Sequence, residues 1–93
     1  MSNQRFASVW DAIEDTPQEA ENMKLRSALM TALKSHLAQT KMSQAQAAQL
    51  FGVTQPRISD LTRGKINLFG LDALVNMASA VGLHVDMRIS QAA

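Results

Sequence analysis

Apolar residues in the first part of the chain recur at the spacing of an amphipathic helix. The pattern i, i+3, i+4, i+7 is carried by Phe6, Val9, Trp10 and Ile13. Such residues share one face of a helix, so the pattern predicts a short helix over residues 6–13. We expect Phe6 and Trp10 to anchor the core or a dimer contact, and a docking surface for a partner protein is the alternative.

A longer helix is predicted from about residue 17 to residue 39. Thr16 is suited to cap it, Pro17 takes the first helical position, and Glu19 completes a capping box three residues after the cap. Its leucines recur every four residues, at Leu25, Leu29, Leu33 and Leu37. This spacing places an apolar stripe along one side of the helix.

A short helix is predicted after Ser43. The Ser43 hydroxyl and the Gln46 side chain have the spacing of a second capping box. The helix is expected to end at Gly52, because glycine adopts the left-handed backbone conformation that other residues avoid.

A second short helix follows at once and ends at Gly64. Thr54 is suited to cap it, and Pro56 lies in its first turn, where a missing N–H costs little. In the preceding helix, the small residues Ala47 and Ala48 let the two backbones approach. The residues expected to form the apolar faces of this pair are Leu50, Val53, Ile58 and Leu61. Two short capped helices joined by a tight turn are typical of a helix-turn-helix, whose second helix enters a DNA major groove.

The last third of the chain predicts one more helix and then a strand. The helix spans residues 71–81, and Gly82 ends it. Its apolar face is expected to contain Leu71, Leu74, Val75 and Ala78. The tail alternates apolar and polar residues, which is strand spacing, and its apolar members are Leu83, Val85, Met87 and Ile89. No second strand pattern occurs, so we expect this strand to pair with a second copy and to form a dimer interface. A frayed or loop-covered tail is the alternative.

Composition limits the kinds of protein this chain can be. Its 93 residues, 46% of them hydrophobic, suffice for one domain with a modest core. It has no cysteine, and neither His36 nor His84 has a partner at metal-ligand spacing, so we expect no disulfide and no metal site. No apolar run approaches the roughly 20 residues that cross a membrane, and the start lacks a secretory signal, so a cytoplasmic location is expected.

Charge is distributed unevenly, although the net charge is only +1. Residues 1–21 carry one basic and five acidic residues, a balance of −4. Residues 22–66 carry seven basic residues and one acidic residue, a balance of +6, and residues 67–93 have a balance of −1. A basic middle segment suggests an anionic partner. A plain solvated surface is the alternative.

The helix-turn-helix segment has several distinctive features in a fixed order. They are Ser43-Gln44, Ala47-Ala48, Gly52, Thr54-Gln55 and the ending Leu61-Thr62-Arg63-Gly64-Lys65. In these features, residues 23–81 resemble the lambda-repressor-like, Cro/XRE-type DNA-binding domain. The whole chain, including residues 9–13 and 71–74, also resembles short XRE-type antitoxin regulators of the HigA kind.

The resemblance implies an all-α, lambda-repressor-like helix-turn-helix bundle. With the patterns above, we expect about five helices, including an extra N-terminal helix, and a short C-terminal β-strand. We expect an N-terminal helix and linker over residues 1–22 and a DNA-binding domain over residues 23–82. Residues 83–93 would then form the strand, as a dimerisation element.

The resemblance also implies a set of DNA contacts. The residues expected to contact bases are Thr54, Gln55, Pro56, Arg57 and Asp60. Those expected to contact phosphates are Ser43, Gln44, Ser59, Arg63 and Lys65. Gln55 is suited to pair with adenine, Arg57 with guanine or a phosphate, and Pro56 with a thymine methyl.

Two of these residues have alternative roles. Gln44 could serve only to cap its helix rather than to bind a phosphate. Asp60 could accept a hydrogen bond from cytosine, or it could pair with Arg57 or Arg63 and hold that side chain, which is the role we favour because phosphates repel a carboxylate.

The sequence therefore predicts a sequence-specific regulator that binds double-stranded DNA as a homodimer on a palindromic operator, as a repressor. One alternative is an antitoxin that neutralises a small toxin protein and represses its own operon. Another is a helical dimerisation module without DNA binding. No phosphate-binding loop, nucleophile motif or metalloprotease motif is present, so we expect neither catalysis nor a cofactor.

Overall fold

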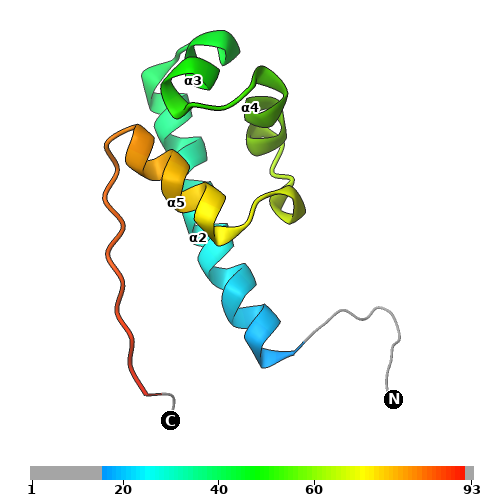
Figure 1. Cartoon of the computed structure of the whole chain (residues 1–93), viewed down its shortest axis with the longest axis vertical. Helices are drawn as coiled ribbons and strands as arrows, with labels where there is room; N and C mark the ends of the chain where they lie inside the picture. Colours follow the sequence, from blue (N-terminus) through cyan, green and yellow to red (C-terminus); the bar gives the residue numbers. More distant parts are fainter. Residues whose placement is uncertain (1–15, 92–93) are drawn as a thin grey trace.

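The computed structural model describes residues 16–91, which form four α-helices and one short 3-10 turn. In chain order these are α2 (Pro17–Thr40), α3 (Gln44–Phe51), α4 (Gln55–Thr62), η1 (Ile66–Leu68) and α5 (Leu71–Ala80). Helix α2 forms the long axis of the molecule, with α3 and α4 near its C-terminal end and α5 across its middle (Figure 1). The helix predicted over residues 6–13 lies outside the described residues.

The start of α2 confirms the predicted capping box. The Thr16 hydroxyl accepts a hydrogen bond from the Glu19 backbone N–H at 3.0 Å, and the Glu19 carboxylate accepts one from the Thr16 N–H at 3.3 Å. The helix ends at Lys41, which adopts a left-handed φ of 53° and donates its N–H to the Leu37 carbonyl. Local hydrogen bonds thus define both ends of the helix that the sequence predicted.

Helices α3 and α4 also begin and end as predicted. The Ser43 hydroxyl accepts from the Gln46 N–H at 3.1 Å, and the Gln46 side chain accepts from the Ser43 N–H at 2.9 Å. Gly52 follows α3 with a φ of 72°, which suits glycine. The Thr54 hydroxyl then accepts from the Arg57 N–H at 3.4 Å at the start of α4.

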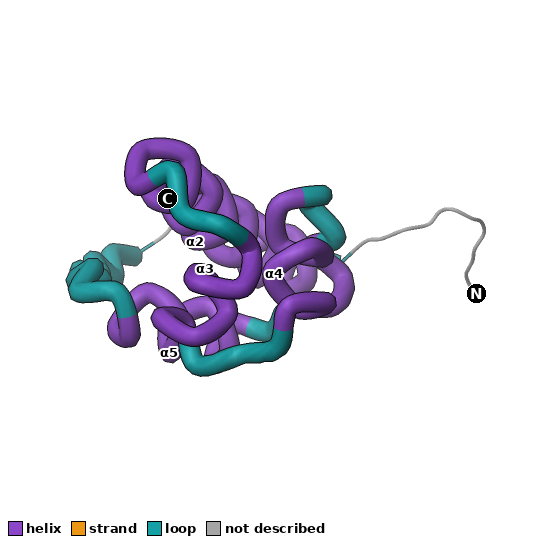
Figure 2. Tube along the Cα trace, turned by 90° about the horizontal axis from the view of Figure 1, so that it is seen from above, coloured by secondary structure: helices purple, strands orange, loops and turns teal. Residues whose placement is uncertain are grey.

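The core lies where the four helices meet. Its buried residues are Met30, Leu33, Ala47, Ala48, Phe51, Ile58, Leu61, Phe69, Leu74, Met77 and Ala78. Helix α5 packs mainly against α2, and α3 packs mainly against α4. Figure 2, which views the helices from above, shows α3, α4 and α5 grouped around α2.

Three residues predicted for the apolar faces are instead exposed. Leu50 is 47% exposed, while its neighbour Phe51 is 3% exposed. Phe51 follows Ala47 and Ala48 by four and three positions, so it shares their buried face, whereas Leu50 points about 100° away from Phe51 and lies outside that face. Leu25 of α2 and Val75 of α5 are likewise 48% and 38% exposed.

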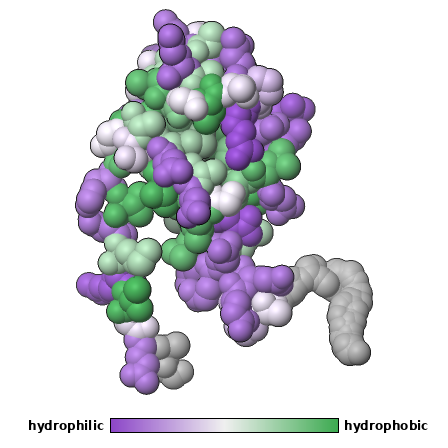
Figure 3. All heavy atoms as spheres, in the orientation of Figure 1, coloured by the Kyte–Doolittle hydropathy of each residue, from purple (hydrophilic) through white to green (hydrophobic). Residues whose placement is uncertain are grey.

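The predicted C-terminal strand is wrong for this structure. Residues 83–91 form no helix and no strand, and the part of the chain that is described contains no strand at all. Apolar and hydrophilic residues still alternate along the tail (Figure 3), where Met87 and Ile89 are 75% and 86% exposed. A strand needs a partner to pair its backbone groups, and the described chain supplies none. The expected bundle of about five helices is likewise corrected to four described α-helices.

The tight contact between α3 and α4 is testable at Ala48, which is 6% exposed. Ala48→Leu should lower the free energy of unfolding by about 1–3 kcal/mol, because a larger side chain overpacks the core. Urea denaturation followed by circular dichroism measures the change. Ala45→Leu is the matched control, since Ala45 is an exposed residue of the same helix. Equal stability of the two variants would contradict the close packing.

Candidate nucleic-acid interface

The first turn of α4 presents three exposed side chains to solvent. They belong to Thr54, Gln55 and Pro56, all of which were predicted to contact bases. Farther along the helix, Ile58 and Leu61 are 1% and 0% exposed. These two residues hold the middle and end of α4 on the core, while the start of the helix stays in solvent, free to meet a large ligand.

Arg57 is half-buried and its guanidinium is bound within the protein. Its Nη1 donates a hydrogen bond of 2.6 Å to the Leu68 carbonyl. The guanidinium carbon also lies 4.0 Å from the centroid of the Phe69 ring, which is a close cation–π contact. The base contact expected of Arg57 stays a prediction, and it would require the side chain to leave these two partners.

Asp60 forms an ion pair with Lys65, with 3.6 Å between Oδ1 and Nζ. The role favoured for Asp60 is to hold a basic side chain. In the structure the basic side chain beside Asp60 is that of Lys65, rather than that of Arg57 or Arg63. The pair is partly exposed, so its contribution to stability is small. Lys65, predicted to contact a phosphate, is thus held beside the last turn of α4.

Two other predicted phosphate contacts lie on or just after α4. Ser59 is half-buried, and its carbonyl accepts a hydrogen bond of 3.0 Å from the Thr62 hydroxyl. Arg63 is exposed and directly follows the helix. Gln55 and Ser59 are four residues apart, so they share one face of α4.

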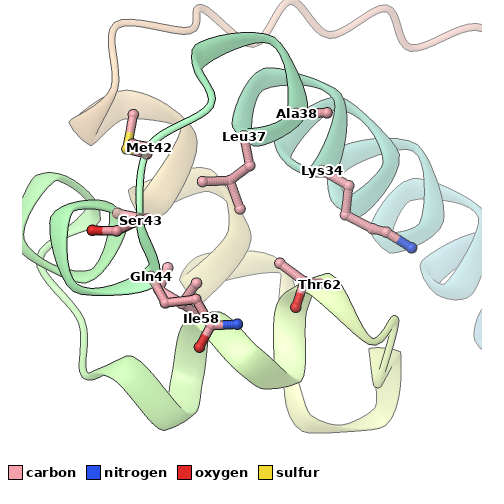
Figure 4. Close-up of a pocket in the computed structure, with 9 residues that line it drawn as sticks. Lys34, Leu37, Ala38, Met42, Ser43, Gln44, Ile58 and Thr62 are labelled. Carbon is pink, nitrogen blue, oxygen red and sulfur yellow. The ribbon is translucent and has the colours of Figure 1, made fainter.

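An open hollow of about 300 Å³ lies between α2, α3 and α4. Gln44, Thr62 and Lys34 line it, and Figure 4 shows that they come from three different helices. Ser43, also on its wall, carries the hydroxyl that caps α3. Both phosphate contacts predicted for the start of α3 therefore lie at one hollow, whose wall is mostly apolar and whose polar groups come from Lys34, Ser43, Gln44 and Thr62.

Sequence reasoning missed Lys34. Its Nζ lies 3.6 Å from the position that a Cβ at Gly64 would take, so this ammonium reaches the segment that contains Arg63 and Lys65. The residues around Lys34 in α2 give no sequence signal that its side chain lies near Gly64. Thirty positions separate it from Gly64, and only the packing of α2 against α4 brings the two together.

Sequence reasoning also missed a second arginine near η1. Arg26 of α2 donates from Nη1 to the carbonyls of Ile66 and Phe69, both at 3.4 Å. Its Nε is buried and has no hydrogen-bond partner in the structure. Partners forty or more positions apart leave no local sequence signal.

The described residues contain neither a metal-binding cluster nor a membrane-spanning helix. No group of three or more histidine, aspartate or glutamate residues there could hold a metal ion. No helix within residues 16–91 is long and apolar enough to span a membrane.

Comparison with known proteins supports a DNA-binding assignment. Residues 12–90 match the protein family described as "Helix-turn-helix domain". The chain is also similar to the solved structure of a protein provisionally named as an XRE-family transcriptional regulator. The two are 28% identical with a TM-score of 0.73, over 80% of this chain and 83% of that chain. None of the curated proteins matches the chain. The chain therefore belongs to the helix-turn-helix domain family, and it is an XRE-type, DNA-binding transcriptional regulator.

Proposed function

We propose that the protein represses transcription by binding a palindromic operator as a homodimer, with one α4 in the major groove of each half-site. The observation that carries this proposal is the exposure of Thr54, Gln55 and Pro56 at the start of α4, a helix whose later residues Ile58 and Leu61 are buried. In helix-turn-helix proteins the start of the second helix contacts base edges. The same end of α4 holds the polar and apolar groups that such contacts require.

Gln55 is the residue best placed to distinguish bases. Its side chain is exposed in the first turn of α4, and a glutamine amide forms a bidentate pair with adenine. The neighbouring Pro56 offers an apolar surface for a thymine methyl. Thr54 already uses its hydroxyl oxygen to cap α4, so its O–H remains to donate to a base or a phosphate.

Phosphate contacts on two sides of α4 would fix the protein on the duplex. On one side, Gln44 lies at the start of α3, where backbone N–H groups and the helix dipole favour an anion. Lys34 lines the same hollow, and its ammonium extends toward Gly64, next to Arg63. On the other side, Arg63 is exposed directly after α4, with Lys65 beside it. Ser59 and Ser43 have hydroxyl groups that would add neutral contacts.

The homodimer is supported by apolar side chains that the described chain leaves in water. Val85, Met87 and Ile89 of the tail are 38%, 75% and 86% exposed, while Leu83 packs partly against the core. We propose that these four side chains contact a second copy. Two recognition helices about 34 Å apart, one turn of DNA, would then read a palindrome.

An antitoxin role is the alternative, and it rests on the acidic balance of −4 over residues 1–21. Such a segment suits a small basic toxin protein. Most of it lies outside the described residues. Purification from the native host separates the two functions, since an antitoxin brings a small basic protein with it.

Selection from a random pool of duplex DNA tests the proposed function. We expect a palindromic site with half-sites one helical turn apart. The logarithm of its binding constant should fall linearly with the logarithm of salt concentration, because bound cations are released from the DNA. Fluorescence anisotropy over a salt series measures this slope. Binding to no sequence, or binding that salt leaves unchanged, would overturn the proposal.

Gln55→Ala should weaken discrimination at one base pair of each half-site by about 1–3 kcal/mol, because the amide pair with the base is lost. Gln55 is exposed, so the melting temperature should stay the same. Competition binding with single-base variants of the selected site measures the effect. Gln49→Ala, an exposed glutamine of α3, is the control, and the same loss in both variants would exclude base reading by Gln55.

Lys34→Ala should reduce the slope of log binding constant against log salt by about one, with base preferences unchanged, because one phosphate contact is lost. Lys24→Ala is the matched control. It removes the same charge from an exposed position of α2 outside the hollow. If both variants reduce the slope equally, Lys34 acts only through net charge and does not contact a phosphate.

A further inference from the structure

The segment between α4 and α5 is held by two arginines from different helices. Arg57 of α4 donates to the Leu68 carbonyl at 2.6 Å. Arg26 of α2 donates to the carbonyls of Ile66 and Phe69, both at 3.4 Å. Three carbonyls in and directly after η1 thus accept hydrogen bonds from guanidinium groups on two sides.

Phe69 connects this segment to the core. It is 1% exposed and is among the largest fully buried side chains of the described chain. The Arg57 guanidinium lies over its ring at 4.0 Å. Arg57 therefore contacts the segment at two places, the Leu68 carbonyl and the buried Phe69 ring. It makes both contacts in the absence of DNA.

The same segment begins with the basic residues proposed to contact phosphate. Arg63 and Lys65 lie between the last turn of α4 and η1. Lys65 is tied to α4 by its ion pair with Asp60 and by its N–H, which donates to the Asp60 carbonyl at 3.1 Å. A change in how η1 sits on α4 would shift these two residues relative to Gln55.

Resting on the proposed function, we infer that Arg57 is a positioning residue and not a base-reading one. It holds η1 against the first turn of α4, and so sets Arg63 and Lys65 at a fixed place relative to the base-contacting end of that helix. In this role the Arg57 guanidinium already has two partners within the protein, the Leu68 carbonyl and the Phe69 ring, and movement of the side chain toward a base would compete with both.

The inference makes a prediction about local motion that does not involve DNA. In Arg57→Gln, hydrogen exchange at the Leu68 and Phe69 amides should become about tenfold faster, because the charged hydrogen bond that holds the segment is lost. Both amides donate within the segment, Leu68 to the Lys65 carbonyl and Phe69 to that of Ile66. NMR measures the exchange, and the α3 amides, which should stay unchanged, serve as the internal reference.

The second prediction concerns DNA. Arg57→Gln should weaken binding to the selected site and to an unrelated duplex by the same factor, about tenfold, and keep the base preference at every position. Loss of preference at a single base pair, with binding to the unrelated duplex retained, would show that Arg57 reads a base and would overturn the inference.

Two further variants keep the test decisive. Arg63→Gln removes the same charge from an exposed position, so it should reduce the salt slope by about one and leave exchange at Leu68 and Phe69 unchanged. Arg57→Lys keeps the charge without the planar guanidinium, and it replaces Arg57→Gln if that variant also accelerates exchange in α3.

The outcomes separate the inference from the proposed function. Unchanged exchange at Leu68 and Phe69 in both Arg57 variants overturns the positioning role alone. Absence of salt-dependent DNA binding by the unaltered protein overturns the proposed function and the DNA part of the inference with it.

Discussion

Helix α4 has eight residues, which is too short for a helix to be stable in water by itself. Its existence depends on the burial of Ile58 and Leu61 against α2 and α3. These residues are three positions apart and so share one face, and Pro56 points away from that face into water. Gln55 lies at the edge of the buried face, in the first turn, where it is still exposed. Removal of water from two apolar side chains thus stabilises the helix and fixes which of its residues point outward.

The segment between α4 and α5 is also too short to be stable by itself, and side-chain hydrogen bonds hold it in place. A 3-10 turn of three residues has too few N–H groups of its own to satisfy every carbonyl in and around it, and unpaired carbonyls near the core are costly. The carbonyls here are satisfied by Arg26 and Arg57, whose planar guanidinium groups carry several donors each. Because the two arginines come from α2 and α4, the segment joins the long helix to the recognition helix. The position of the basic residues near α4 is thus coupled to the packing of the whole bundle.

Much of the structure of α4 and of the preceding helix α3 could be predicted from the sequence, because the signals are local. The Ser43 and Gln46 capping box, the glycine turn at Gly52 and the Thr54 cap all involve partners no more than four residues apart. The partner of Arg57 was not accessible, since it lies eleven positions away on η1, which no sequence pattern predicted. Lys34 was missed for the same reason.

By itself, then, the sequence determined where the described helices begin and end, and that two of them form a helix-turn-helix. Caps and turns depend on residues that are neighbours along the chain, so the pattern of residue types suffices to predict them. Only the tertiary structure decided that Phe51 rather than Leu50 enters the core and that the tail alternation forms no strand. The tertiary structure also decided that Arg57 lies on Phe69. Each of these outcomes depends on which distant segment is available to pack or to pair, and a one-dimensional pattern does not contain that information.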